Sequence, residues 1–131
     1  MNLLTKKIKS ELPKLYAQEN KGNEAIVYVK FFTPDSDWTW YATEGEEVID
    51  EETGEVLDFR FFGLVNGLEK ELGYFSLNEL KMYNSPLGLT IERDLYWEPK
   101  MLKEIFEWKE WDYAYWDNSW KFNKWSKGTS D

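Results

Sequence analysis

The sequence contains no cysteine and no histidine. Without cysteine the chain cannot form a disulfide, a thiolate zinc site, an iron–sulfur cluster or a thiol nucleophile. Without histidine it lacks the commonest general base and transition-metal ligand, and a Ser–His–Asp triad is excluded. No catalytic residue, cofactor or metal is therefore predicted.

The sequence also lacks any run of about 20 apolar residues, so no segment is predicted to cross a membrane. At the N-terminus, Lys6, Lys7 and Lys9 interrupt what would be the apolar core of a signal peptide. We therefore expect the protein to act in the cytoplasm.

Basic residues are absent from one long stretch. Between Phe31 and Phe59 there are ten carboxylates and no lysine or arginine, whereas the rest of the chain holds 15 acids and 16 bases. The formal net charge of -9 therefore belongs to this stretch. A concentrated negative field attracts basic surfaces and repels nucleic acid. We predict a protein partner with a basic surface and no direct contact with nucleic acid; the sequence leaves the oligomeric state open.

Aromatic residues make up 18% of the 131 residues. A chain of this length fits one domain with a real core, and we expect residues 1–131 to form a single domain. Each buried ring removes about 150–250 Å² from water, so the core is predicted to be rich in aromatic side chains.

Three helices are predicted. Apolar residues spaced by three or four over residues 4–15 indicate an N-terminal helix, with Thr5 as its N-cap and Pro13 near its end. Residues 76–79 form a capping box that opens a short helix. Pro99 is typical of a first helical turn and predicts a C-terminal helix.

β-branched and aromatic residues predict four strands, and residues 91–97 are either a fifth strand or an ordered edge segment. Residues 66–67 (Asn-Gly) indicate a tight hairpin, and Gly63 suggests a bulge or close backbone approach. The resulting fold class is α+β, an antiparallel sheet of four to five strands with the first and last helices on one face. The four predicted strands are residues 25–32, 37–43, 56–65 and 68–75.

Residues 44–55 form an acidic excursion with an expected turn at Thr53-Gly54. One interpretation is a solvated segment that keeps an aromatic-rich protein in solution. Another is a surface that mimics the phosphates of DNA and occupies a basic protein site. A third is a cation site built from Asp50, Glu51, Glu52 and Glu55, although the spacing does not match an EF-hand loop. The candidate partner-binding acids are Glu44, Glu46, Glu47, Asp50, Glu51, Glu52 and Glu55.

Trp38 and Trp40 alternate with Thr39 and Tyr41, which places the two tryptophans on one face of a strand. They are either core residues or a stacking floor for a ligand ring. The alternative to a binding protein is a small ligand-binding or hydrolytic domain with a pocket near Trp38, Trp40, Tyr41, Glu92 and Arg93.

Arg93 lies between two acids in the sequence Glu-Arg-Asp. An ion pair with Glu71 or Glu79 that fixes the sheet is the expectation.

The C-terminal part of the chain is rich in tryptophan and carries charges of both signs. Trp111, Trp116 and Trp120 are candidate anchors for a partner, because exposed aromatic residues mark interfaces. A terminal element that folds back over the sheet is the alternative.

Several stretches resemble a known family. They are LLTKKIKSELPKLY at the start, KFFTPDSDWTWYATEG (30–45), FFGLVNGLEKELGYFSLNEL (61–80) and PLGLTIERDLYWEP (86–99). Over about residues 3–99 the chain resembles the uncharacterised bacterial family catalogued as domain of unknown function 2958. The resemblance implies a small single-domain protein of a kind found on plasmids, integrative elements and phages, without an agreed activity.

Charge and resemblance together predict a non-enzymatic adaptor or inhibitor. Its expected target is a host protein of defence or nucleic-acid handling, bound through a negative surface that resembles DNA.

Overall fold

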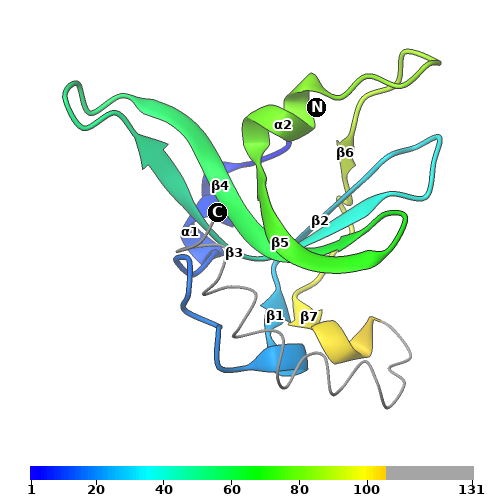
Figure 1. Cartoon of the computed structure of the whole chain (residues 1–131), viewed down its shortest axis with the longest axis horizontal. Helices are drawn as coiled ribbons and strands as arrows, with labels where there is room; N and C mark the ends of the chain where they lie inside the picture. Colours follow the sequence, from blue (N-terminus) through cyan, green and yellow to red (C-terminus); the bar gives the residue numbers. More distant parts are fainter. Residues whose placement is uncertain (106–131) are drawn as a thin grey trace.

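The computed structural model describes residues 1–105; residues 106–131 lie outside this description. Its centre is an antiparallel five-stranded sheet with the strand order β5-β4-β3-β2-β6 (Figure 1). The α+β class and the antiparallel sheet are therefore confirmed. The strands are β2 (Val29–Phe32), β3 (Thr39–Ile49), β4 (Val56–Asn66), β5 (Lys70–Ser76) and β6 (Glu92–Arg93).

Two short α-helices begin where the sequence predicts them. In α1 (Lys6–Glu11) the Thr5 hydroxyl accepts a hydrogen bond from the Ile8 amide at 3.2 Å. In α2 (Leu77–Met82) the Ser76 hydroxyl accepts one from the Glu79 amide at 3.1 Å. Such side-chain acceptors satisfy amides that have no partner within the first helical turn.

The C-terminal helix predicted from Pro99 is not supported. Residues 100–104 instead form β7 (Lys100–Met101) and the 3-10 turn η2 (Leu102–Glu104). β7 pairs with β1 (Ile26–Val27), and the Leu102 amide donates to the Ala25 carbonyl at 3.0 Å. η2 also contacts the 3-10 turn η1 (Gly22–Glu24), which precedes β1. Residues 100–102 thus form hydrogen bonds with a segment distant in the sequence instead of the local hydrogen bonds of a helix. The rest of the expected helix lies outside the described residues.

Both faces of the sheet are covered. Phe61 of β4 belongs to a core that also includes Leu4 near the N-terminus and Leu80 of α2. Phe62, the next residue, faces a second core that includes Val27 of β1 and Leu102 of η2. Figure 1 accordingly places α2 on one side of the sheet and the β1–β7 pair on the other. The prediction that the first and last helices share one face is therefore wrong, because β1, β7 and η2 cover the second face.

The predicted close approach at Gly63 is confirmed. A Cβ atom at this position would lie 1.8 Å from the Tyr41 carbonyl oxygen. The pairing of β3 with β4 shifts register between Ala42 and Glu44, beside this contact. Only glycine allows the two backbones to approach this closely.

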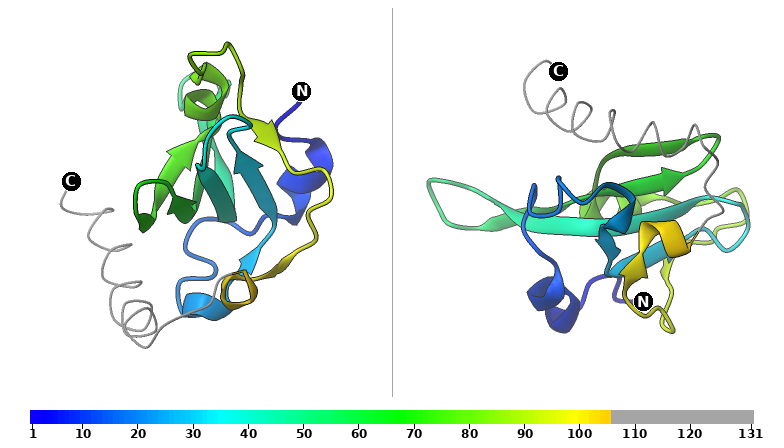
Figure 2. Two further views of the ribbon diagram at one scale, coloured as in Figure 1. Left: turned by 90° about the vertical axis from the view of Figure 1, so that its right-hand side faces the viewer. Right: turned by 90° about the horizontal axis from the view of Figure 1, so that it is seen from below.

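β3 and β4 continue beyond the strands on either side of them. The pairing of β2 with β3 ends at Ala42, and that of β5 with β4 ends at Arg60, but β3 and β4 stay paired as far as Ile49 and Val56. We call residues 46–58, a two-stranded ribbon that projects from the body, the acidic arm (Figure 2, right).

The second strand was predicted to end at residue 43, but β3 continues for six more residues, to Ile49. Cross-strand pairing with β4 sustains the ribbon despite the low strand propensity of glutamate. The expected turn is confirmed: Gly54 has φ 76°, and the Asp50 amide donates to the Glu55 carbonyl at 2.8 Å.

Candidate functional site

Glu44 does not belong to an exposed acidic surface, contrary to the sequence-based assignment. Its side chain is fully buried, and its two carboxylate oxygens accept hydrogen bonds from the amides of Tyr16 and Gln18, each at 2.7 Å. Tyr16 has φ 76°, a left-handed conformation that non-glycine residues rarely adopt. Glu44 therefore stabilises a strained turn inside the protein.

The base of the acidic arm is attached to the N-terminal segment. Glu46 Oε1 accepts a hydrogen bond from the Leu15 amide at 3.1 Å, and Glu47 Oε2 lies 3.4 Å from Lys9 Nζ. The same ammonium lies 5.8 Å from the centre of the Phe59 ring. Because two-stranded ribbons are marginally stable alone, these contacts help to fix the arm.

The opposite strand of the arm is attached to α2. Asp58 Oδ1 accepts a hydrogen bond from the Asn78 amide, and Asn78 Nδ2 donates to the Leu57 carbonyl, both at 3.0 Å. The two strands of the ribbon are thus held from two separate elements. Its direction relative to the sheet is set by these contacts.

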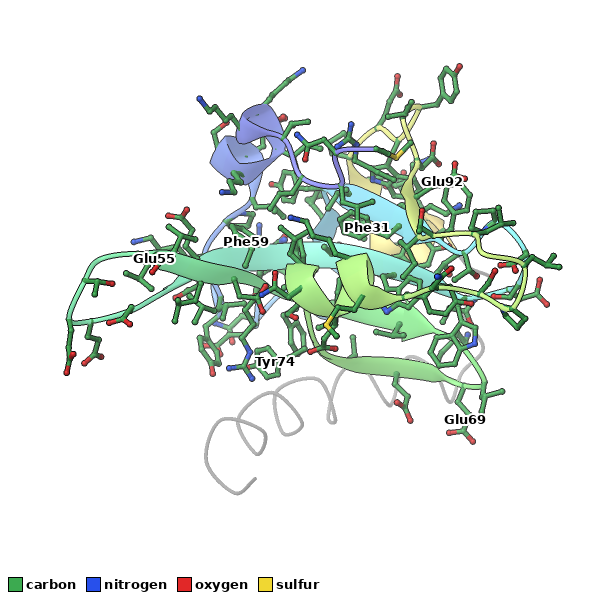
Figure 3. All side chains as sticks on the ribbon, turned by 90° about the horizontal axis from the view of Figure 1, so that it is seen from above. Phe31, Glu55, Phe59, Glu69, Tyr74 and Glu92 are labelled. Carbon is green, nitrogen blue, oxygen red and sulfur yellow. The ribbon has the colours of Figure 1, made fainter. Side chains whose placement is uncertain are left out.

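The tip of the arm has a different character. Asp50 Oδ1 accepts hydrogen bonds from the amides of Glu52 and Thr53 at 2.9 and 3.2 Å, which shapes the turn. Glu51, Glu52 and Glu55 are exposed, and no lysine or arginine of residues 1–105 forms an ion pair with them. Figure 3 shows Glu55 on the projecting ribbon. With respect to the described part of the chain, the tip therefore presents unpaired negative charge to solvent.

The arm also exposes aliphatic side chains, which the sequence analysis missed. Two aliphatic pairs flank the turn almost symmetrically in EEVIDEETGEVLDF, and this mirrored pattern was the available signal. Exposed aliphatic groups beside charges are typical of protein contact surfaces. The residues and their exposed fractions are Val48 38%, Ile49 49%, Val56 48% and Leu57 50%.

A cavity of about 410 Å³ lies where the arm meets the sheet. On its wall the Arg60 guanidinium lies 4.3 Å from the centre of the Tyr74 ring, and the Tyr74 hydroxyl donates to the Tyr16 hydroxyl at 3.0 Å. Burial, reinforced by this hydrogen bond, raises the pKa of Tyr74 above its ordinary value. Tyr74 is therefore a neutral hydrogen-bonding group at physiological pH. The cavity is lined by Val48, Asp58, Arg60, Tyr74, Phe75, Ser76 and Glu79.

The predicted cation site can be compared with the arrangement of the acidic side chains. In residues 1–105 no group of three or more acidic side chains is arranged to hold a metal ion. The four acids considered as a cation site, Asp50, Glu51, Glu52 and Glu55, all lie within this range.

The residues of the alternative pocket are not brought together. Trp38 and Trp40 lie on the same side of β3, with ring centroids 5.9 Å apart, and Trp40 packs against the first core. Tyr41 is buried in the second core, on the other side of the sheet. Glu92 pairs with Phe32 at the β6 edge. The sheet therefore divides this set of residues.

Arg93 does not form the expected ion pair with Glu71 or Glu79. Its guanidinium donates to the Asn2 carbonyl, and its amide lies 3.2 Å from Met1 Sδ. Arg93 therefore holds the N-terminal segment against the sheet edge. It also lines a cavity of about 290 Å³ between α1 and residues 93–99.

The three candidate tryptophan anchors, Trp111, Trp116 and Trp120, lie outside the described residues. Their role as partner anchors stays a prediction.

The fold and arm define a small acidic α+β protein with a projecting hairpin. The chain belongs to the family described as Protein of unknown function (DUF2958), which it matches over residues 3–112. The match extends beyond the stretches that carry the resemblance and includes Trp108 and Trp111. Comparison with curated proteins and with solved structures gave no significant match. No helix in residues 1–105 is long and apolar enough to span a membrane.

Proposed function

We propose that this protein is a non-enzymatic binding protein whose acidic arm docks onto a basic surface of another protein. One observation carries the proposal. The arm holds seven carboxylates and no basic residue, and within residues 1–105 a single ion pair, Lys9–Glu47, offsets this charge. The remaining charge is available to attract a partner, and long-range attraction of this kind accelerates association.

The shape and composition of the arm support a protein as the partner. A ribbon that extends from the body can enter a concave surface, which a flat acidic patch cannot. The exposed aliphatic residues Val48, Ile49, Val56 and Leu57 supply apolar contact area beside the charges. Charge complementarity guides an encounter, whereas buried apolar area contributes most of the affinity.

The proposal extends to partners that normally hold nucleic acid. Such proteins carry basic surfaces for phosphate groups, and a carboxylate-rich ribbon can occupy the same surface. Bound there, the protein acts as an inhibitor or adaptor of a host defence or nucleic-acid-handling protein in the cytoplasm. This role agrees with the mobile-element and phage context that the family resemblance implies.

Capture of partners from a host lysate at low and high salt tests the proposal. We expect a partner with a basic surface that is retained at low salt and released as salt rises, because salt screens charge attraction. A variant with Glu51, Glu52 and Glu55 each changed to Lys loses this partner. These three side chains have no ion pair among the described residues, so the variant keeps its fold, which circular dichroism checks.

The matched control changes Glu11, Asp35 and Glu98 to Lys, which alters the net charge equally on exposed positions outside the arm. This control variant retains the partner. Retention of the partner after reversal of Glu46, Glu47, Glu51 and Glu52 together would refute the proposal, as would equal loss in the control.

A further inference from the structure

A second negatively charged site lies at the opposite end of the sheet from the arm tip. There the β4–β5 turn and the residues before β3 enclose a cavity of about 290 Å³. Figure 3 shows Glu69 at this end and Glu55 at the other. The cavity is lined by Trp38, Val65, Leu68, Glu69 and Glu71.

The aromatic wall of this cavity is Trp38, which is 39% exposed. A Cβ atom at Gly67 would lie 2.4 Å from the six-membered ring of Trp38. Gly67 therefore lets the indole lie directly against the hairpin turn. Trp40 supports the indole from the neighbouring position, with the ring centroids 5.9 Å apart. The indole is thus held in place while part of it stays open to a ligand.

The charged wall consists of Glu69 and Glu71. Both side chains are exposed, and neither forms an ion pair with any residue of the described part of the chain. The lysine between them, Lys70, pairs with Asn66, whereas Glu71 pairs with Val65. Since successive strand residues point to opposite faces, Lys70 lies on the other side of the sheet from Glu71. Within residues 1–105, no lysine or arginine lines the cavity.

An indole with two adjacent carboxylates is complementary to a planar cation. A guanidinium group stacks on an aromatic ring, while its N–H groups donate to carboxylates that lie in the plane of the guanidinium. A lysine ammonium group would suit this cavity less well because it has no planar surface to stack on the indole, and a neutral ring would suit it less well because it carries no positive charge. The adjoining aliphatic wall, Val65 and the 94% exposed Leu68, suits the methylene stem of an arginine.

We propose that this cavity binds an arginine side chain of a partner protein. The inference concerns residues outside the acidic arm and does not depend on the arm's role.

Titration of the full-length protein with N-acetyl-arginine N-methylamide tests the inference. The indole N–H signal of Trp38, identified by its loss in Trp38→Phe, reports binding in nuclear magnetic resonance spectra. We expect a saturable shift of this signal with the arginine compound. The neutral citrulline counterpart has nearly the same shape and produces little shift.

Two charge variants separate the cavity from general attraction. The double variant Glu69→Gln/Glu71→Gln is expected to raise the dissociation constant for the arginine compound about five-fold, because two charge-assisted contacts are lost. The double variant Glu51→Gln/Glu52→Gln removes the same amount of charge at the arm tip. It leaves the dissociation constant for the arginine compound within about two-fold of the original value, since the tip is farther from the cavity than the screening length.

Gly67→Ala displaces the Trp38 ring and also weakens binding. Absence of a saturable shift, an equal response to citrulline, or equal weakening by the arm-tip pair would overturn the inference.

Discussion

Glu44 and Glu51 stand seven positions apart in the same acidic stretch, yet they occupy opposite environments. Glu44, inside the protein, accepts two amide hydrogen bonds and holds the turn at Tyr16. Glu51, at the arm tip, is exposed to solvent. A run of acids in a sequence therefore mixes structural and surface groups, and only the three-dimensional neighbours separate them.

The largest expected effect comes from replacing the buried acid. Glu44→Leu leaves the Tyr16 and Gln18 amides without their acceptor and lowers the free energy of unfolding by about 3 kcal/mol. Glu44→Gln keeps one acceptor oxygen and gives an intermediate loss. Urea denaturation measures both.

Glu51→Leu at the arm tip is the matched substitution. It changes the free energy of unfolding by less than about 0.5 kcal/mol, the usual range for surface positions. Equal losses at positions 44 and 51 would mean that the contrast between the two acids is wrong.

Substitution of two glycines, Gly63 in the body and Gly54 in the arm, tests the same contrast through the free energy of unfolding. Gly63→Ala places a Cβ against the Tyr41 carbonyl and lowers the free energy of unfolding by about 2 kcal/mol. Gly54→Ala meets no neighbouring atom within 4 Å, but its φ of +76° is unfavourable for alanine and costs about 1 kcal/mol. Thermal denaturation of the two variants ranks them. The reverse order would show that the arm turn, rather than the β3–β4 contact, is the more constrained.

The smallest effect concerns pH at the junction of arm and body. The pKa of Tyr74 is raised in the folded state, so as pH rises through 10.0 the unfolded chain releases this proton first. The free energy of unfolding therefore falls with rising pH above that value. Tyr74→Phe makes this decline less steep, measured as unfolding free energy against pH.

The slopes, rather than the absolute stabilities, are compared, because the variant also loses the hydrogen bond to Tyr16. Tyr96→Phe is the control, since Tyr96 is 93% exposed. An unchanged slope in Tyr74→Phe would contradict the assigned environment of this hydroxyl.

Local signals predicted much of the fold. The N-caps Thr5 and Ser76, the turn at Gly54 and the close approach at Gly63 each depend on a few neighbouring residues, and the sequence indicated all four. Strand alternation likewise separated Trp40 from Tyr41. The alternative pocket nevertheless included both residues, which the structure places in different cores.

The remaining features depend on partners distant in the sequence. Burial of Glu44 requires amides 26 and 28 positions away, and β7 forms because β1 is available to pair with it. The length of the arm depends on pairing between β3 and β4, which residue propensities alone do not reveal. Val48 and Ile49 fell in the predicted acidic excursion and Val56 and Leu57 in a predicted strand, so the sequence did not group these four aliphatic residues.

β4 connects the arm directly to the hairpin beside Trp38. Its 11 residues run without interruption from Val56 to Asn66, and at roughly 3.4 Å per residue they span about 35 Å. The arm tip and the cavity beside Trp38 therefore lie at opposite ends of one strand. No single small ligand is long enough to contact both of these negatively charged sites.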